Sequence, residues 1–318
     1  MWASSRLTVH GMLRSTLLAA ARSGVVRAAV EAGPFDPLVD RFVAGTTVDA
    51  AIAAARTITA DRLVTVDHLG EDTTDRPQAD ANVAAYRALL RRLGDEGLAD
   101  RVEVSVKLSA FGQRLPRDGE KIALESARQV CEAAAAVGTT VTVDMEDHTT
   151  TDATLTTVRD LRPDFPWVGA VLQSHLRRTE GDCRELAGPG SRVRLCKGAY
   201  EEPESVAFRS TAEVDLSYVR CLKILMAGQG LPMAATHDPR LVAIARHLAQ
   251  RHGRSVGDYE LQMLYGVRPH AQTDLAARGL RVRVYLPYGT EWFGYFMRRL
   301  AERPANLAFF ARSLMSRG

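Results

Sequence analysis

The chain has 318 residues, of which 46% are hydrophobic and 25% are charged, a composition typical of a globular protein that can bury a large core. Its net charge of +3 is too small to indicate a nucleic-acid partner, and no apolar run approaches the roughly eighteen residues that a membrane-spanning helix needs. The four cysteines show neither CxxC nor zinc-binding spacing, so we expect reduced thiols in a reducing compartment.

The first sixty residues are predicted to be helical, with an alanine-rich helix at about Thr47–Ala60. The first thirty carry arginines but no acid before Glu31, which is the composition of a transit peptide. The apolar stretch Leu17–Ala21 is too short and too closely flanked by arginine for a signal peptide. We therefore favour an N-terminal helix that the protein retains.

After this segment, short β-type runs alternate with stretches of helical composition. The runs are Leu63–Leu69, Val102–Leu108, Thr139–Met145, Val168–Gln173, Val193–Lys197, Pro232–His237, Tyr259–Leu264 and Val282–Leu286. The intervening segments with helical spacing include Ala79–Arg92, Gly119–Ala136, Ala207–Ala227 and Arg240–His252.

Eight strands that alternate with helices predict a distorted (β/α)8 barrel over residues 61–318, with residues 1–60 as extra N-terminal helices of the same structural domain. The alternative is an open doubly wound sheet. Its GxGxxG signature is absent, because Gly188-Pro-Gly190 is followed by Val193 where the third glycine should stand.

In a barrel of this kind the functional groups lie at the carboxyl ends of the strands. A lysine near the end of an otherwise apolar strand is more often functional than solvated, which draws attention to two positions. With three arginines they predict a cationic mouth suited to phosphates and a carboxylate. Its members are Lys107, Lys197, Arg194, Arg298 and Arg299.

Acidic groups at the same ends have other expected roles. Asp147 and Asp238 each precede a predicted helix and are expected to cap it. Asp144, Glu146 and His148 include types that bind metals, but alternation along a strand directs neighbours to opposite faces, so we expect no metal site.

The last predicted strand leads through a glycine turn into a helix rich in functional groups. Pro287 is expected to end the strand, and Thr290 and Glu291 suit the cap and first turn of a helix that runs to about Arg303. On that helix Tyr295, Arg298, Arg299 and Glu302 are related by steps of three and four residues. One glutamate cannot neutralise two guanidinium groups, so the surplus charge suits a small anion such as a carboxylate.

Several stretches resemble the proline dehydrogenases, flavoenzymes built on a distorted (β/α)8 barrel. They occur in the order of that family and span most of the chain. The matching motifs are SVKLS (Ser105–Ser109), VDMED (Val143–Asp147), LQSHL (Leu172–Leu176), RLCKGAYEEP (Arg194–Pro203), ATHDPR (Ala235–Arg240), LQMLYGVRP (Leu261–Pro269) and YLPYGTEWFGYFMRRLAERPAN (Tyr285–Asn306).

The resemblance implies roles for individual residues. Arg298, Arg299 and Lys107 would bind the proline carboxylate, while Tyr285, Tyr295 and Leu264 would shape the pocket around the ring. The candidate catalytic residues are Asp144 and Arg194. The positions that match the FAD site are Asp144, Met145, Gln173, Arg194, Cys196, Lys197, Gly198, Tyr200, Thr236 and His237.

The chemistry that the resemblance implies is the FAD-dependent oxidation of L-proline to Δ1-pyrroline-5-carboxylate, the first step of proline catabolism to glutamate. The deprotonated amine would drive hydride to flavin N5, and Tyr285 favours proline over hydroxyproline. Electrons would pass to a quinone, a separate pyrroline-5-carboxylate dehydrogenase would act next, and the protein would be cytoplasmic with peripheral contact at the inner membrane surface.

Two other classes remain open at this point. A Schiff-base lyase or aldolase on the same barrel would use Lys197 or Lys107 as its nucleophile and would need no flavin. A binding scaffold without activity is disfavoured, because many ionisable groups converge on one end of the barrel.

Overall fold

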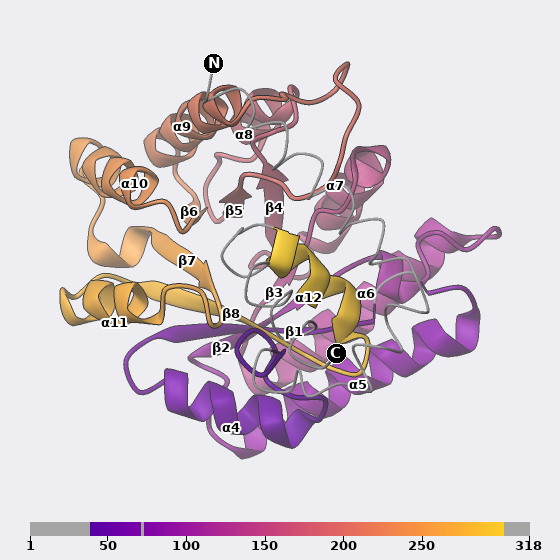
Figure 1. Ribbon diagram of the computed structural model, residues 1–318. Helices are drawn as coiled ribbons and strands as arrows, with labels where there is room; N and C mark the ends of the chain where they lie inside the picture. The colour runs from indigo at the N-terminus through magenta and orange to yellow at the C-terminus, as the bar shows by residue number, and fades with distance from the viewer. Residues whose placement is uncertain (1–38, 71–72, 302–318) are drawn as a thin grey trace, which may run out of the picture.

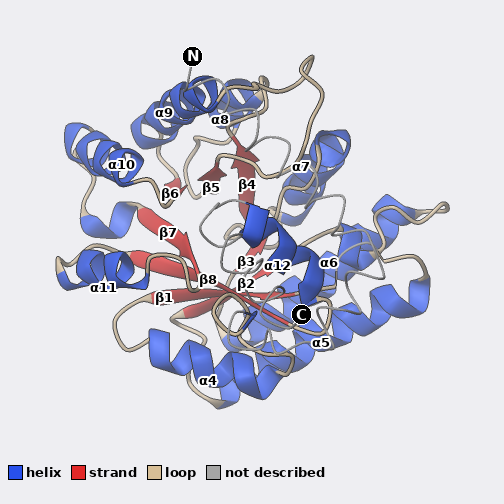
Figure 2. Ribbon diagram, in the orientation of Figure 1, coloured by secondary structure: helices blue, strands red, loops and turns tan. Residues whose placement is uncertain are grey.

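Eight strands pair in parallel, each with the next in sequence, and close into a barrel, as the alternation of strands and helices predicted (Figures 1 and 2). The computed structural model describes residues 39–70 and 73–301. The strands are β1 (Leu63–His68), β2 (Val102–Val106), β3 (Val141–Val143), β4 (Gly169–Gln173), β5 (Arg192–Cys196), β6 (Leu231–Ala235), β7 (Glu260–Leu264) and β8 (Val282–Tyr288). β1 and β8 close the barrel along a register that runs from Leu63↔Arg283 to His68↔Tyr288.

Helices follow the strands and surround the barrel in Figure 1. The α-helices are α4 (Val48–Ile58), α5 (Arg76–Asp95), α6 (Gly119–Val137), α7 (Thr151–Leu161), α8 (Thr179–Glu185), α9 (Thr211–Ala227), α10 (Pro239–Arg251), α11 (Pro269–Ala277) and α12 (Trp292–Ala301). Short 3-10 helices lie at η1 (Ser109–Phe111), η2 (His148–Thr150) and η3 (Val256–Asp258). Within the described ranges, none of these helices combines the length and apolarity needed to cross a bilayer.

Local capping explains where the helices begin. Asp238 caps α10 by accepting from the backbone N–H of Arg240, and Asp147 caps η2 in the same way, so both capping predictions are confirmed. The predicted helix Ala207–Ala227 begins four residues too early. Ser210 and Glu213 form a reciprocal capping box, which fixes the start of α9 at Thr211.

The end of the chain differs from the prediction in two details. β8 does not stop before Pro287 but continues to Tyr288, because its pairing with β1 extends to His68↔Tyr288 and the N–H of Leu69 donates to the carbonyl of Tyr288. α12 begins at Trp292, so Glu291 precedes its first turn. The predicted helices before residue 39, the partner Glu302 and the helix stop at Pro304 lie outside the described residues.

The hydrophobic core lies between the barrel and its helices. The apolar residues of β1, β2, β3 and β8 pack with α4, α5 and α6, and those of β4 to β7 pack with α8, α9 and α10. Because side chains alternate along a strand, the intervening polar residues point into the barrel. The interior is therefore lined by groups such as Thr65, Glu103, Arg194, Gln262 and Arg283, all buried.

α12 lies across the carboxyl end of the barrel, over its middle in Figure 1. Its apolar face packs on the end of β1 and on the segment before α4, through a small cluster separate from the main core. The members of this cluster are Val39, Phe42, Val43, Leu69, Phe293, Tyr295, Phe296 and Met297. This packing fixes the helix over the same barrel end as the predicted functional groups.

Candidate active site

A buried network joins residues of four strands at the carboxyl end of the barrel. The carboxylate of Asp144, just after β3, accepts from Arg194 Nη1 of β5 at 2.7 Å and from the hydroxyl of Tyr285 of β8 at 2.7 Å. Ser105 of β2 also donates to Asp144, at 2.7 Å. Burial raises the pKa of Tyr285 well above its usual value, so the phenol stays protonated as the donor.

Lys107 extends this network toward β1. Its Nζ lies 2.6 Å from a carboxylate oxygen of Asp67, 3.3 Å from the hydroxyl of Tyr285 and 3.6 Å from Asp144. The side chain of Lys107 is 11% exposed and that of Asp67 is 1% exposed. The network therefore places an ammonium group at the edge of a buried and largely charge-balanced cluster.

All three nitrogen atoms of the Arg194 guanidinium donate hydrogen bonds. Nε donates to Gln262 at 2.7 Å, Nη1 to Asp144 and Ser105, and Nη2 to Thr65 and Glu103 at 3.4 Å. A guanidinium has five N–H donors, and each of them has an acceptor here. In this arrangement Arg194 contributes its positive charge rather than a spare hydrogen-bond donor.

A second ionic layer lies deeper in the barrel. Arg283 donates to Glu260 at 2.7 and 3.0 Å, and Arg192 is paired with Glu103. Burial alone would raise the pKa of Glu103, but Arg283, Arg192 and Arg194 outweigh it and hold that pKa well below its usual range. The pKa of Glu260 is lowered in the same way. Barrel interiors are commonly filled with aliphatic residues; this one holds ion pairs.

The sequence placed Lys197 in a cationic mouth with Lys107 and Arg194, but its ammonium is not part of this network. Its Nζ lies 2.5 Å from Asp215 of α9, which also receives Arg240 at 3.4 Å. The lysine is therefore engaged by a carboxylate on the surrounding helices.

The helix α12 presents the predicted arginines at the same barrel end. Arg299 is buried, and its guanidinium carbon lies 5.0 Å from the ring centroid of Tyr295, a cation–π distance. Arg298, the preceding residue, is half-buried. Both arginines therefore lie on the helix that covers the barrel end, and neither is on an exposed face of it.

The predicted cofactor residues of β3, β4 and β5 lie side by side at the strand ends. The Nε2 of Gln173 donates to the backbone oxygen of Glu146 at 2.6 Å, and Met145 is buried beside β4 and β5. Cys196 ends β5; burial raises the pKa of its thiol to about 11, so it is a neutral side chain at physiological pH.

Gly198 follows β5 in a backbone conformation that side chains rarely adopt, with φ +103°. A Cβ at this position would lie 2.5 Å from the ring of His175, so the loop and the ring are in close contact. The neighbouring Tyr200 is half-buried. The missing side chain of Gly198 therefore lets the ring of His175 pack directly on the backbone after β5.

The ends of β6 and β7 are joined through His237. Its Nε2 accepts the backbone N–H of Leu264 at 2.9 Å, so in the neutral ring the proton is on Nδ1. Thr236 is buried, and its hydroxyl accepts from the N–H of Asp238. Leu264 pairs with Tyr285 in the β7–β8 register.

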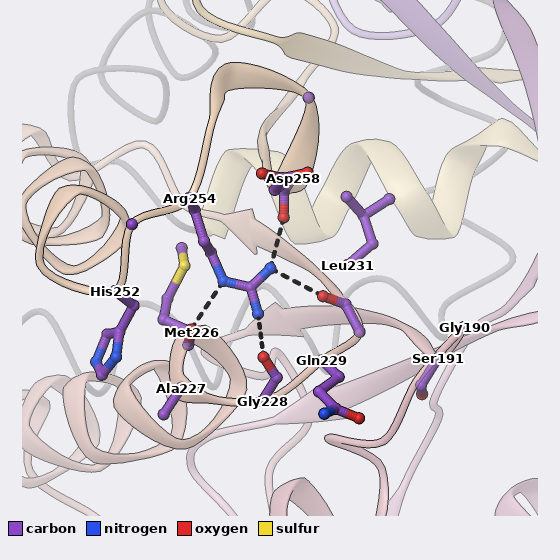
Figure 3. A pocket seen from close by; sticks show the side chains of 13 residues that line it. Gly190, Ser191, Met226, Ala227, Gly228, Gln229, Leu231, His252, Arg254 and Asp258 are labelled. Atoms are coloured by element: carbon purple, nitrogen blue, oxygen red, sulfur yellow. Dashed lines mark hydrogen bonds between the residues drawn. The ribbon is translucent and has the colours of Figure 1, made fainter.

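Figure 3 shows a hollow at another place, near the C-terminus of α9. Arg254 lies in it and donates to five backbone carbonyls, those of Leu225, Met226, Gly228, Gly230 and Asp258. All its donors are used: three carbonyls are at the end of α9, and those of Gly230 and Asp258 lie before β6 and in η3. The hollow therefore has a structural explanation and offers no free cation to a ligand.

Sequence reasoning missed Asp67, Glu103 and Glu260. Each occupies a strand position that alternation directs inward, and that parity was the available signal. The alternation identifies these residues as interior only when the register shows which face of each strand points into the barrel.

A (β/α)8 barrel with buried ion pairs at its carboxyl end and an arginine-bearing helix above them has the construction of an enzyme for a small charged substrate. The sequence model of the proline dehydrogenase family matches residues 51–312. The chain belongs to the proline dehydrogenase family and is thus an oxidoreductase.

Relatives with that name are close in length. The chain is 35% identical over 278 residues to proline dehydrogenase 1 of Bacillus subtilis strain 168, covering 87% of this chain and 90% of the relative. It is 38% identical over 283 residues to proline dehydrogenase of Deinococcus radiodurans, with the same two shares.

Solved structures share the fold. A proline utilization A protein from Bdellovibrio bacteriovorus, inactivated by N-propargylglycine, superimposes with a TM-score of 0.78 at 24% identity. This match covers 94% of the present chain but 37% of that longer one. A proline utilization A variant from Bradyrhizobium japonicum gives a TM-score of 0.72 at 22% identity and covers 89% of this chain and 32% of that one.

Proposed function

We propose that the protein oxidises L-proline to Δ1-pyrroline-5-carboxylate with FAD as its cofactor, the first step of proline catabolism. The observation that carries the proposal is the buried network of Lys107, Tyr285, Asp144 and Arg194 beneath α12, in a chain of this family. The network combines cations for an acid substrate with a rigid aromatic wall.

The charge balance supports a specific site for the substrate carboxylate. Asp67 and Asp144 already match Lys107 and Arg194 in charge. An added carboxylate needs further positive charge, and Arg298 and Arg299 lie on the helix that covers this end. We therefore assign the carboxylate to the two arginines together with Lys107, and the ring to the wall formed by Leu264, Tyr285 and Tyr295.

The strand ends from β4 to β6 fit a flavin nucleotide. The loop after β5 begins at Gly198, whose missing side chain lets the ring of His175 pack on the backbone, and Tyr200 follows two residues later. Lys197, which also pairs with Asp215, and His237 lie at these strand ends, and we assign them to the diphosphate of the nucleotide. When bound there, FAD would supply the acceptor for a hydride from the ring carbon of proline.

The residues around the reacting atoms would act by orientation and charge. Arg194 has no unused donor, so we assign it electrostatic stabilisation of negative charge on the reduced cofactor. Asp144 keeps Arg194 and Tyr285 in their relative positions through hydrogen bonds of 2.7 Å. Burial of the site excludes water from the hydride-transfer step.

The alternative of a Schiff-base lyase is less well supported. Its nucleophile would be the neutral amine of Lys107 or Lys197. Both amines are in ion pairs, with Asp67 at 2.6 Å and with Asp215 at 2.5 Å, and a protonated amine is not a nucleophile.

The other partners follow from the family alone. We propose a quinone as the electron acceptor, a separate pyrroline-5-carboxylate dehydrogenase for the next oxidation, and a cytoplasmic protein that meets the inner membrane surface peripherally.

The test is the visible spectrum of the purified protein before and after anaerobic addition of L-proline. A flavin spectrum that bleaches with proline, and not with D-proline, is the expected result. A colourless protein that does not change after addition of FAD and proline contradicts the proposal. Borohydride trapping of a lysine by a carbonyl substrate would then favour the lyase.

A further inference from the structure

Asp67 lies next to the last residue of β1 and has no exposed surface. Its carboxylate accepts a hydrogen bond from Lys107 Nζ at 2.6 Å; the hydroxyl of Tyr86 lies 3.3 Å away, but its one proton has a closer acceptor in the carbonyl of Ser105, at 2.6 Å. A carboxylate without access to water is unfavourable unless a cation and hydrogen bonds compensate it. Asp67 and Lys107 therefore hold each other in a defined position.

The surroundings of Lys107 show what this anchoring achieves. The ammonium has three N–H donors; Asp67 takes one and the hydroxyl of Tyr285, at 3.3 Å, is placed to take another. Asp144 is a second carboxylate within ion-pair distance, at 3.6 Å, but it already binds Arg194 at 2.7 Å. Without the charge of Asp67, Lys107 would be drawn toward Asp144 and would compete with Arg194 and Tyr285 for it.

We infer that Asp67 is a positioning residue for substrate binding: it anchors the ammonium of Lys107 beside Tyr285 and directs it toward the carboxylate of the acid substrate. This inference rests on the proposed function. The negative charge of Asp67 also repels the substrate carboxylate, and this repulsion would weaken binding. Because the two charges of the ion pair are so close together, their fields largely cancel at the substrate. The fixed orientation of the ammonium should then make the net effect of Asp67 on substrate affinity favourable.

The test compares Asp67→Asn with a matched control, Asp100→Asn, which alters an exposed aspartate in the turn before β2. We expect Asp67→Asn to raise the KM for L-proline about tenfold or more while kcat changes less than about threefold, the pattern of lost binding. The Kd of cyclopentanecarboxylate, a ring acid that cannot be oxidised in this way, should rise by a similar factor in calorimetry. Asp100→Asn should match the wild type. A KM and Kd that stay unchanged or fall overturn the inference.

A second comparison does not require that Asp67→Asn folds with an unpaired buried lysine. Lys107→Met removes the cation, and Asp67→Asn in that background removes the carboxylate that it leaves behind. If Asp67 aids binding only through Lys107, its removal from the Lys107→Met protein does not weaken binding: the Kd for cyclopentanecarboxylate stays the same or falls, because the unpaired carboxylate repels the anion. A further loss in the double variant overturns the inference. A wild type that neither oxidises proline nor binds the ring acid overturns the proposed function and this inference with it, whereas an active wild type matched by Asp67→Asn overturns the inference alone.

Discussion

The guanidinium of Arg194 lies between two carboxylates from different layers of the barrel, Asp144 at 2.7 Å and Glu103 at 3.4 Å. It links the functional end of the barrel to the ionic layer below. This position means that one side chain serves both the proposed chemistry and the fold.

Replacing Arg194 with methionine should therefore reduce stability strongly. Two buried carboxylates lose their shared cation, and breaking a buried ion pair from one side costs about 3–5 kcal/mol. Urea unfolding of the wild type and the variant measures the difference. Arg128→Met, which removes an ion pair with Asp164 at the surface, is the control and should cost less than about 1 kcal/mol. Equal losses in the two variants would mean that the ionic interior contributes no more than a surface pair.

Acid should destabilise the protein through Glu103 and Glu260, whose pKa values are lowered in the folded state. Below the unfolded pKa of about 4.3 the unfolded chain binds protons that the folded chain does not, so the free energy of unfolding falls with decreasing pH. Above that pH the contribution of both groups is fully present. We expect urea midpoints that change little from pH 7 to 5 and fall steeply below about pH 4.

The control for the acid effect is Asp152→Asn, which alters a carboxylate that is 84% exposed and should leave the steepness below pH 4 unchanged. Glu260→Gln should be less stable at pH 7 and should show a shallower decline in acid. A decline as steep as that of the wild type would exclude Glu260 as a contributor.

The fold could be predicted from the sequence because the signal is local. Apolar runs such as Val102–Val106 and Val282–Leu286 mark strands whether or not their partners are known. The short helices α7, α8 and α11 were not among the segments identified, and α8 has only seven residues, too few for a clear helical period.

The site was harder to predict because it depends on pairings between distant strands. Lys197 has the same signature as Lys107, a lysine at a strand end, yet one pairs with a helix and the other with β1. Nothing local to either lysine distinguishes the two outcomes. Which acid meets which cation is decided by barrel register and by loops, and neither is encoded in one segment.

Gly198 should not tolerate a side chain. Gly198→Ala requires φ +103° for an alanine and places its Cβ 2.5 Å from the ring of His175. Gly190→Ala is the matched control, with φ +72° but no atom within 4 Å of its Cβ, so it has the backbone strain without the clash. We expect about 1 kcal/mol for Gly190→Ala and a larger loss, with lower flavin content per protein, for Gly198→Ala. Equal stability and flavin content in both variants would contradict the close contact between the backbone of Gly198 and the ring of His175.

Arg298→Met should weaken proline binding. Removing one partner of a desolvated charge pair costs about 2–5 kcal/mol, seen here as a higher KM with a smaller effect on kcat. Arg278→Met, at an exposed arginine after α11, is the control and should leave both constants unchanged. A wild-type KM for Arg298→Met would remove this arginine from the substrate site.

Glu202 should fasten the loop after β5 to the start of η2. Its carboxylate is buried, accepts the backbone N–H of His148 at 2.9 Å and pairs with the Nδ1 of the same residue. Glu202→Gln exchanges a charge-assisted contact for a neutral one, so we expect a loss of about 1–3 kcal/mol and faster hydrogen exchange in residues 198–210. The neighbouring Glu201 is exposed, so Glu201→Gln controls for the loss of one negative charge in the same loop. Because the proposed flavin site includes Tyr200 of this loop, loss of the contact should also lower flavin retention on dilution. If the amides of residues 198–210 exchange at the same rate in Glu202→Gln and Glu201→Gln, the ion pair does not restrain the loop. The order of the loop must then come from the packing of Gly198 on His175.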